Sequence, residues 1–180
     1  MSTTAAPELW RTIAQDAIAE SSLWGGMLRD EDDRELEPVF SPLADGRFAL
    51  GLETIYEGYL VHYGTPRLFE PADQDTALLL GDYLYAHGLV RIAACGDVEA
   101  VADLSELISL SSQLRAESAE GDGPLWAATA ALLGAGARLD AARAALRLRG
   151  DPALLDADAR EAAGDEAVDR SLAAHRGRLR

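Results

Sequence analysis

Two long helix-forming segments, residues 48–61 and 76–95, constrain the fold of this 180-residue chain more than any other feature. In the first segment, apolar residues recur at i, i+3, i+4, i+7 and i+8: Leu52, Ile55, Tyr56, Tyr59 and Leu60. That spacing predicts a helix with one core-facing side. The second segment is apolar nearly all round, so we expect it to be the central, buried helix of the domain. Gly64 and Pro66 end the first helix, and Asp73 and Asp75 are expected to cap the second.

Helical patterns also occupy most of the remaining chain. Helices are expected at 7–24, 98–119 and 125–149, and Gly134 and Gly136 would introduce a kink into the last of these. Asp97 is expected to cap the helix that follows it. Alanine, leucine, glutamate and arginine are abundant and β-branched residues are scarce. The sequence therefore predicts an all-α helical bundle, with a single domain over residues 1–150 and a charged, loosely attached helical tail over 151–180.

Charge and composition argue against several classes of function. A net charge of −15 would repel nucleic-acid phosphates and anionic membranes. No apolar run approaches the roughly 18 residues that a membrane span requires. Residues 1–7 lack the pattern of a signal peptide, so a cytoplasmic location is expected. Cys95 is the only cysteine, which excludes an intrachain disulfide, and it is expected to be buried. The acidic run 30–37 and the terminal arginines are expected to be solvated: Arg176, Arg178 and Arg180.

Motifs in the two central segments resemble those of the trans-polyprenyl diphosphate synthases. The first segment matches the pattern L-E-x-I-H-x-x-x-L-x-H at Leu52, Glu53, Ile55, Leu60 and His62. The second matches A-x-L-x-G-D-Y-L at Ala77, Leu79, Gly81, Asp82, Tyr83 and Leu84. A later alanine-rich stretch, from Gly123 to Gly134, resembles a third helix of the family but lacks its lysine-threonine pair. The resemblance covers about residues 48–136 and implies a truncated isoprenoid synthase core.

The residues that perform the chemistry of this family are missing. Its members ionise an allylic diphosphate with magnesium ions held by an aspartate-rich motif, because a hard cation prefers carboxylate ligands. Here the five residues after His62 include no acid, and Gly64 and Pro66 would break the helix. A second register places Glu53 and Glu57 on the aspartate motif, where they share one helix face. The late acidic group at 165–169 is interpreted as a charged surface helix.

The missing ligands favour a non-catalytic protein. Some synthases of this superfamily pair a catalytic subunit with a small helical subunit that lacks the aspartate motifs, and this chain resembles such a subunit. It is expected to dock on a catalytic prenyl synthase or to self-associate, without a cofactor. His62, Arg67 and Asp82 are candidates for lining a cleft, with Asp82 expected to pair with Arg67 or Arg91, or to bond to a tyrosine hydroxyl. The alternatives are an active transferase that binds magnesium through Glu53 and Glu57, and an unrelated helical interaction protein.

Overall fold

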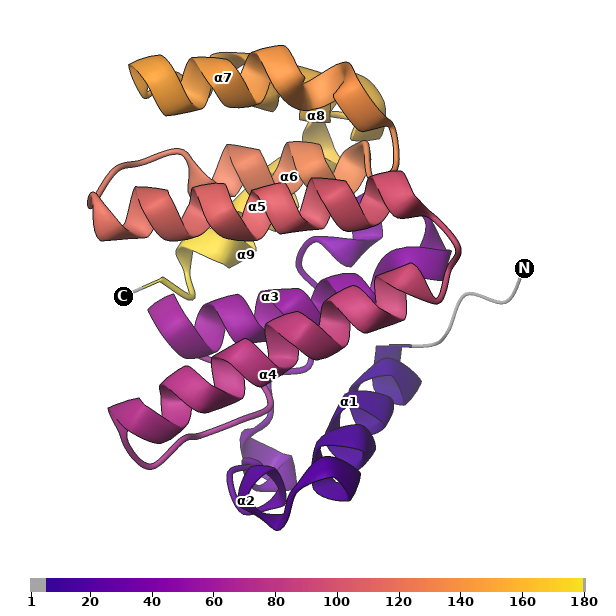
Figure 1. The fold of residues 1–180 in the computed structure, drawn as a ribbon, viewed down its shortest axis with the longest axis vertical. Helices are drawn as coiled ribbons and strands as arrows, with labels where there is room; N and C mark the ends of the chain where they lie inside the picture. Colours follow the sequence, from indigo (N-terminus) through magenta and orange to yellow (C-terminus); the bar gives the residue numbers. More distant parts are fainter. Residues whose placement is uncertain (1–5, 180) are drawn as a thin grey trace.

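The computed structural model describes residues 6–179, which form nine α-helices and no β-strand. The predicted all-α fold is confirmed. The helices follow one another as α1 (Ala6–Glu20), α2 (Ser22–Gly25), α3 (Ala49–Tyr63), α4 (Gln74–Ala93), α5 (Val98–Ala116), α6 (Asp122–Ala131), α7 (Asp140–Arg149), α8 (Ala153–Ala163) and α9 (Asp165–Arg176). They stack along the long axis of the molecule, from α1 and α2 at one end to α7 and α8 at the other (Figure 1).

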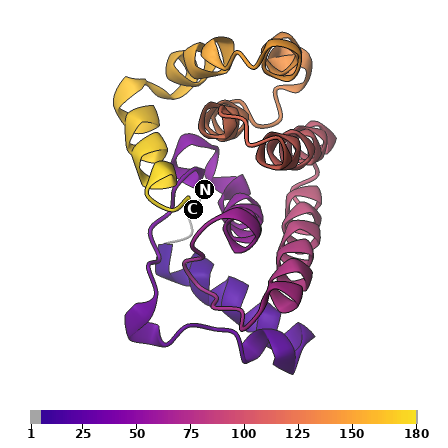
Figure 2. The ribbon, with the colours of Figure 1, turned by 90° about the vertical axis from the view of Figure 1, so that its left-hand side faces the viewer.

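The buried centre of the fold is α3, not α4 as the sequence pattern indicates. Every residue of α3 from Gly51 to Val61 is buried. In contrast, α4 lies at the side of the bundle and exposes more than half of Leu78, Leu79 and Val90. The expectation was wrong because α3 is covered from several directions, by α1, by α4 and by the turn at Ser41–Leu43, whereas α4 packs mainly against α3 and α5 (Figure 2).

Two pairs of glycines let α3 and α4 pack closely. Gly51 and Gly58 are seven residues apart on α3, and they face Gly88 and Gly81, which are seven apart on α4. A Cβ atom on Gly88 would lie 3.0 Å from the carbonyl oxygen of Gly51, and one on Gly58 would lie 3.0 Å from that of Gly81. Because backbone atoms occupy these positions, larger residues would force the helices apart.

Caps and breaks set the helix ends, and two differ from the expected boundaries. Asp73 forms a capping box with Thr76, and Asp97 accepts a hydrogen bond from the amide of Ala100, so these two predicted caps are confirmed, whereas Asp75 lies in the first turn of α4 and is not its cap. The expected helix 7–24 is interrupted at Ser21, whose side chain caps a separate helix, α2. The expected helix 125–149 is interrupted between α6 and α7. Gly134 and Gly136 adopt positive φ angles there (84° and 63°), which break the helix rather than kink it.

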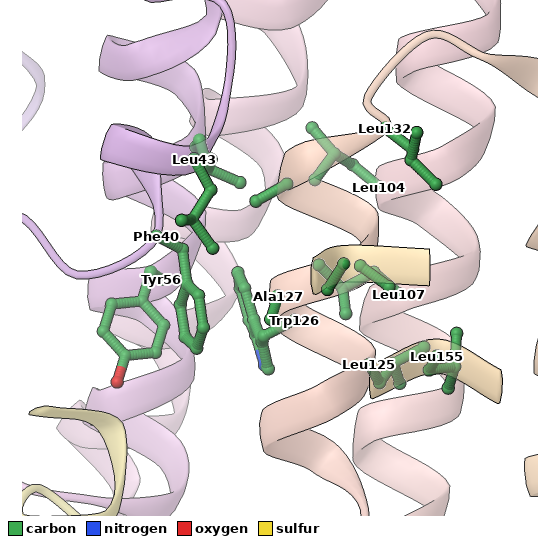
Figure 3. Close-up of a cluster of buried hydrophobic side chains, with 14 of the residues drawn as sticks. Phe40, Leu43, Tyr56, Leu104, Leu107, Leu125, Trp126, Ala127, Leu132 and Leu155 are labelled. Carbon is green, nitrogen blue, oxygen red and sulfur yellow. The ribbon is translucent and has the colours of Figure 1, made fainter. Parts of the chain in front are cut away.

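The C-terminal segment is not loosely attached. The structure packs α8 and α9 on α6, and their apolar side chains enter the main core: Leu155, Ala159, Val168 and Leu172. Figure 3 shows this core, in which Trp126 stacks on Phe40 beside Tyr56, and Leu155 lies next to Leu125. Arg178 is held as well, because its carbonyl accepts from the Thr65 amide (2.8 Å) and its guanidinium reaches Glu35 (3.1 Å). Arg176 is exposed.

Other expectations from the sequence concern the surface. The acidic run forms a short, exposed 3₁₀ turn at Glu31–Asp33. Cys95 is half-buried rather than buried, and its thiol lies 3.3 Å from the carbonyl oxygen of Arg47. Within the described residues, no helix is both long and apolar enough to cross a membrane. The described residues exclude residues 1–5 and Arg180. Residues 1–5 make up most of the segment that was assessed for a signal peptide.

Candidate functional site

The two glutamates of the alternative metal site form a buried ionic cluster with Arg67. The Arg67 guanidinium donates from Nη1 to Oε2 of Glu53 (2.6 Å) and from Nε to Oε2 of Glu57 (3.0 Å). Its plane also packs against the rings of Trp10 and Tyr56, with Cζ 4.3 and 4.9 Å from their centroids. All three charged side chains are fully buried. Burial alone would lower the pKa of Arg67, but the two carboxylates outweigh that effect and raise it.

Main-chain amides occupy the remaining glutamate oxygens. Oε1 of Glu53 accepts from the amides of Val39 (3.1 Å) and Ser41 (2.9 Å). Oε1 of Glu57 accepts from the amides of Arg67 and Leu68, both at 2.8 Å. With these bonds, each glutamate fixes a loop segment to α3, and the four carboxylate oxygens of the two glutamates all have partners. The cluster therefore has the character of a structural link, and Arg67 lines no cleft.

His62 and Asp82, the other two sequence candidates, meet at the surface where α3 and α4 cross. Nε2 of His62 lies 3.4 Å from Oδ1 of Asp82, whose side chain is 68% exposed. Burial lowers the pKa of His62, and the Asp82 carboxylate offsets part of that decrease. The expected partners of Asp82 were wrong, because Arg91 instead donates to Asp16 (2.6 Å) on α1.

A pocket of about 900 Å³ opens elsewhere, where the end of α5 meets the start of α6 and the helices α8 and α9. Its walls combine charged and apolar side chains. The lining includes Tyr63, Arg115, Glu120, Asp122, Leu172, His175 and Leu179. The volume is in the range of cavities that hold small molecules. Within the described chain, no three histidine, cysteine or acidic residues gather as a metal site would require.

The floor of this pocket is the buried carboxylate of Asp122. Tyr59 on α3 donates its hydroxyl to Oδ2, and the amide of Gly123 donates to Oδ1 (3.0 Å). Nε of Arg115 and Nε2 of His175 each lie 3.6 Å from Oδ2. Burial alone would raise the pKa of Asp122, but its contacts with His175, Tyr59 and Arg115 outweigh burial and lower the pKa to about 2. The carboxylate is therefore ionised at neutral pH.

His175 reaches this floor from α9 and is only 1% exposed. Its Nδ1 lies 2.9 Å from the hydroxyl of Tyr56. Burial raises the pKa of Tyr56, so the hydroxyl stays protonated and can donate to Nδ1. That bond favours the tautomer with a proton on Nε2. Nε2 is buried and has no hydrogen-bond partner among the described residues, because the Asp122 oxygen is too distant.

The side chains that meet at Asp122 were not among the site candidates suggested by the sequence. Tyr59 lies on α3, Arg115 and Asp122 flank the loop between α5 and α6, and His175 lies near the end of the chain. Tyr59 was expected only as a core residue, and the segment with His175 was expected to be a loose tail. The one available signal is that the chain holds three histidines, and a histidine that follows an apolar stripe is a candidate for burial.

Comparisons with known proteins find no match to this chain. No family model matches the sequence, and neither the curated proteins nor the solved structures contain a match. The resemblance to polyprenyl diphosphate synthases thus rests on the motifs in α3 and α4.

Proposed function

We propose that this protein is a non-catalytic helical subunit that docks on a catalytic prenyl diphosphate synthase in isoprenoid biosynthesis. The motifs that resemble the synthase family support the proposal, and so does the state of Glu53 and Glu57. Both carboxylates already bind Arg67 and main-chain amides, so neither has an oxygen to spare for magnesium. A magnesium site there would first have to break a fully buried ion pair, which is costly.

One observation carries the docking proposal, an exposed apolar line along α4. Its members recur at intervals of seven, four and three residues and lie on one side of the helix: Leu79, Ala86, Val90 and Ala93. This is the spacing at which helices pack side by side, and the two alanines allow close approach. Leu79 belongs to the motif that resembles the synthase family. We call this surface the α4 stripe.

Co-expression with the long-chain prenyl synthase of the same host tests the proposal. The two proteins should co-purify, and the partner's product length should differ from that of the partner alone. Leu79→Glu and Val90→Glu should each weaken the complex at least tenfold, because a charge would enter an apolar interface. Leu148→Glu is the matched control, since Leu148 is an exposed leucine on α7. No complex, or equal effects of all three substitutions, would contradict docking through the α4 stripe.

A turnover assay tests the non-catalytic part separately. The purified chain, incubated with allylic and isopentenyl diphosphates and magnesium, should release no product above the level without protein. If the purified chain does turn over these substrates, and if Glu53→Gln or Glu57→Gln abolishes turnover while the variant stays folded, the glutamates act as metal ligands.

A further inference from the structure

We infer that the pocket between α5, α6 and α9 binds a small organic anion, with a carboxylate or phosphate group and an apolar body. The first observation is the orphaned Nε2 of His175. A buried polar atom without a partner costs free energy, so such an atom at the wall of a pocket indicates a bound group that completes its hydrogen bond.

The donors at the pocket floor define the chemistry of the ligand. His175 presents Nε2–H, and Nε of the Arg115 guanidinium lies at the same distance, 3.6 Å, from the Asp122 oxygen Oδ2 that Nε2 faces. The oxygens of Asp122 already accept from Tyr59 and Gly123. Nη2 of Arg115 already donates to the carbonyl oxygen of Tyr63 (3.4 Å), whereas Nε2 of His175 has no partner among the described residues, so what the floor lacks is an acceptor. Carboxylate and phosphate groups suit it best, because their oxygens can accept from an arginine and a second donor at once.

The charges around the pocket are balanced. The lining carries three arginines (Arg115, Arg160 and Arg176) and three acids (Glu120, Asp122 and Asp156), and Arg160 also pairs with Asp165 and Asp169 outside the lining. An anion is therefore held by the local donors of Arg115 and His175 and not by the overall charge of the pocket. Leu172 and Leu179 supply apolar wall, which favours a ligand with an apolar body over a bare inorganic ion. The inference does not depend on the docking proposal, because the α4 stripe is on another helix.

Histidine NMR tests the inference directly, because the chain has three histidines. Benzoate, phenyl phosphate and the neutral benzamide serve as probes. Benzoate or phenyl phosphate at millimolar concentration should shift the imidazole ¹⁵N signals of His175 in a saturable way. His87, which lies on α4, should not respond. Benzamide should bind at least tenfold more weakly, because it lacks the charge that pairs with Arg115.

Substitutions give a second readout. Arg115→Gln should weaken benzoate binding about tenfold or more while the histidine spectrum stays that of a folded protein. Arg138→Gln is the matched control, an exposed arginine on the turn before α7, and it should leave binding unchanged. If neither anion shifts the His175 signals, the inference is wrong. Equal affinity for benzamide, or an Arg115→Gln variant that binds normally, would overturn the assignment of an anion.

Discussion

Two buried polar clusters touch α3, and they differ in how completely their hydrogen bonds are formed. In the Arg67 cluster, every carboxylate oxygen of Glu53 and Glu57 has a partner. In the Asp122 cluster, Nε2 of His175 has none within the described residues, and a pocket opens beside it. Tyr56 joins the two, with its ring on the Arg67 guanidinium and its hydroxyl on His175.

The difference separates a structural cluster from a candidate binding site. Burial of charge alone does not distinguish them, because both contain buried carboxylates beside arginine. In the Arg67 cluster, the glutamates accept hydrogen bonds from loop amides. These bonds hold residues 39–41 and 67–68 against α3. In the Asp122 cluster, Nε2 of His175 is left without an acceptor among the described residues. The unsatisfied donor at a pocket wall therefore marks the Asp122 cluster, and not the acidic pair at metal-binding spacing, as the candidate binding site.

The largest effect is expected from Arg67→Met. This change leaves two buried glutamates without their counter-charge and should lower the free energy of unfolding by about 3–5 kcal/mol. Urea denaturation measures it. Arg138→Met, which removes an exposed ion pair with Glu161, should change stability by less than about 1 kcal/mol. Similar values for the two variants would mean that the Arg67 cluster is not the structural link described above.

Asp122→Asn should cost about 2 kcal/mol near neutral pH, and the cost should depend on pH. The folded carboxyl has its pKa lowered from 3.8 to about 2. Its ionised form therefore stabilises the fold above about pH 4, and this contribution is lost as the pH falls toward 2. Urea denaturation of both proteins over that range should show the gap closing at low pH. A gap independent of pH would disprove the role of the charge.

Tyr56→Phe should cost about 1 kcal/mol, because the buried Nδ1 of His175 loses its partner. It should also weaken the preference for the Nε2–H tautomer, which imidazole ¹⁵N shifts report. Tyr85→Phe is the matched control. The Tyr85 hydroxyl is buried without a hydrogen bond, so its removal should be neutral or slightly stabilising. Equal losses of stability would indicate that the Tyr56 hydroxyl makes no effective bond.

The smallest effect is expected from Asp82→Asn. His62 and Asp82 form a counterpart of the His175–Asp122 contact in which the carboxylate is 68% exposed, and a pair with one solvated member contributes little. Stability should change by less than about 0.5 kcal/mol. The pKa of His62 should fall further, since Asp82 partly offsets the decrease that burial causes. An NMR titration of the histidines measures this shift, and a rise in the pKa would contradict the assigned pairing.

Local sequence signals predicted local structure well. The apolar spacing of residues 52–60 gave α3, and Asp73 and Asp97 cap the helices that follow them. The pattern failed for α4, where Leu79 and Val90 face solvent, because hydropathy cannot tell a core-facing leucine from an exposed one. A better signal was present in the seven-residue spacing of Gly51 with Gly58 and of Gly81 with Gly88, which marks the contact between the two helices.

The candidate site also depends on contacts that local sequence patterns do not predict. The site candidates from the sequence are residues that lie close together in motifs, such as Glu53 and Glu57. In the structure, both glutamates form buried ion pairs with Arg67. The candidate site instead joins Asp122 on α6 with His175 on α9, and Tyr59 on α3 donates to Asp122. No periodicity links positions so far apart in the chain. Their proximity depends on α9 folding back onto α6.

By itself, the sequence determined the helices of this protein, because backbone propensity, apolar spacing and capping side chains act within a few neighbouring residues. Which helix became the centre, and which polar groups found partners, was decided only when distant segments packed together. The physical reason is that burial and hydrogen-bond satisfaction are properties of the assembled interior. The same carboxylate is a metal ligand or a structural anchor according to which side chains the fold brings to it.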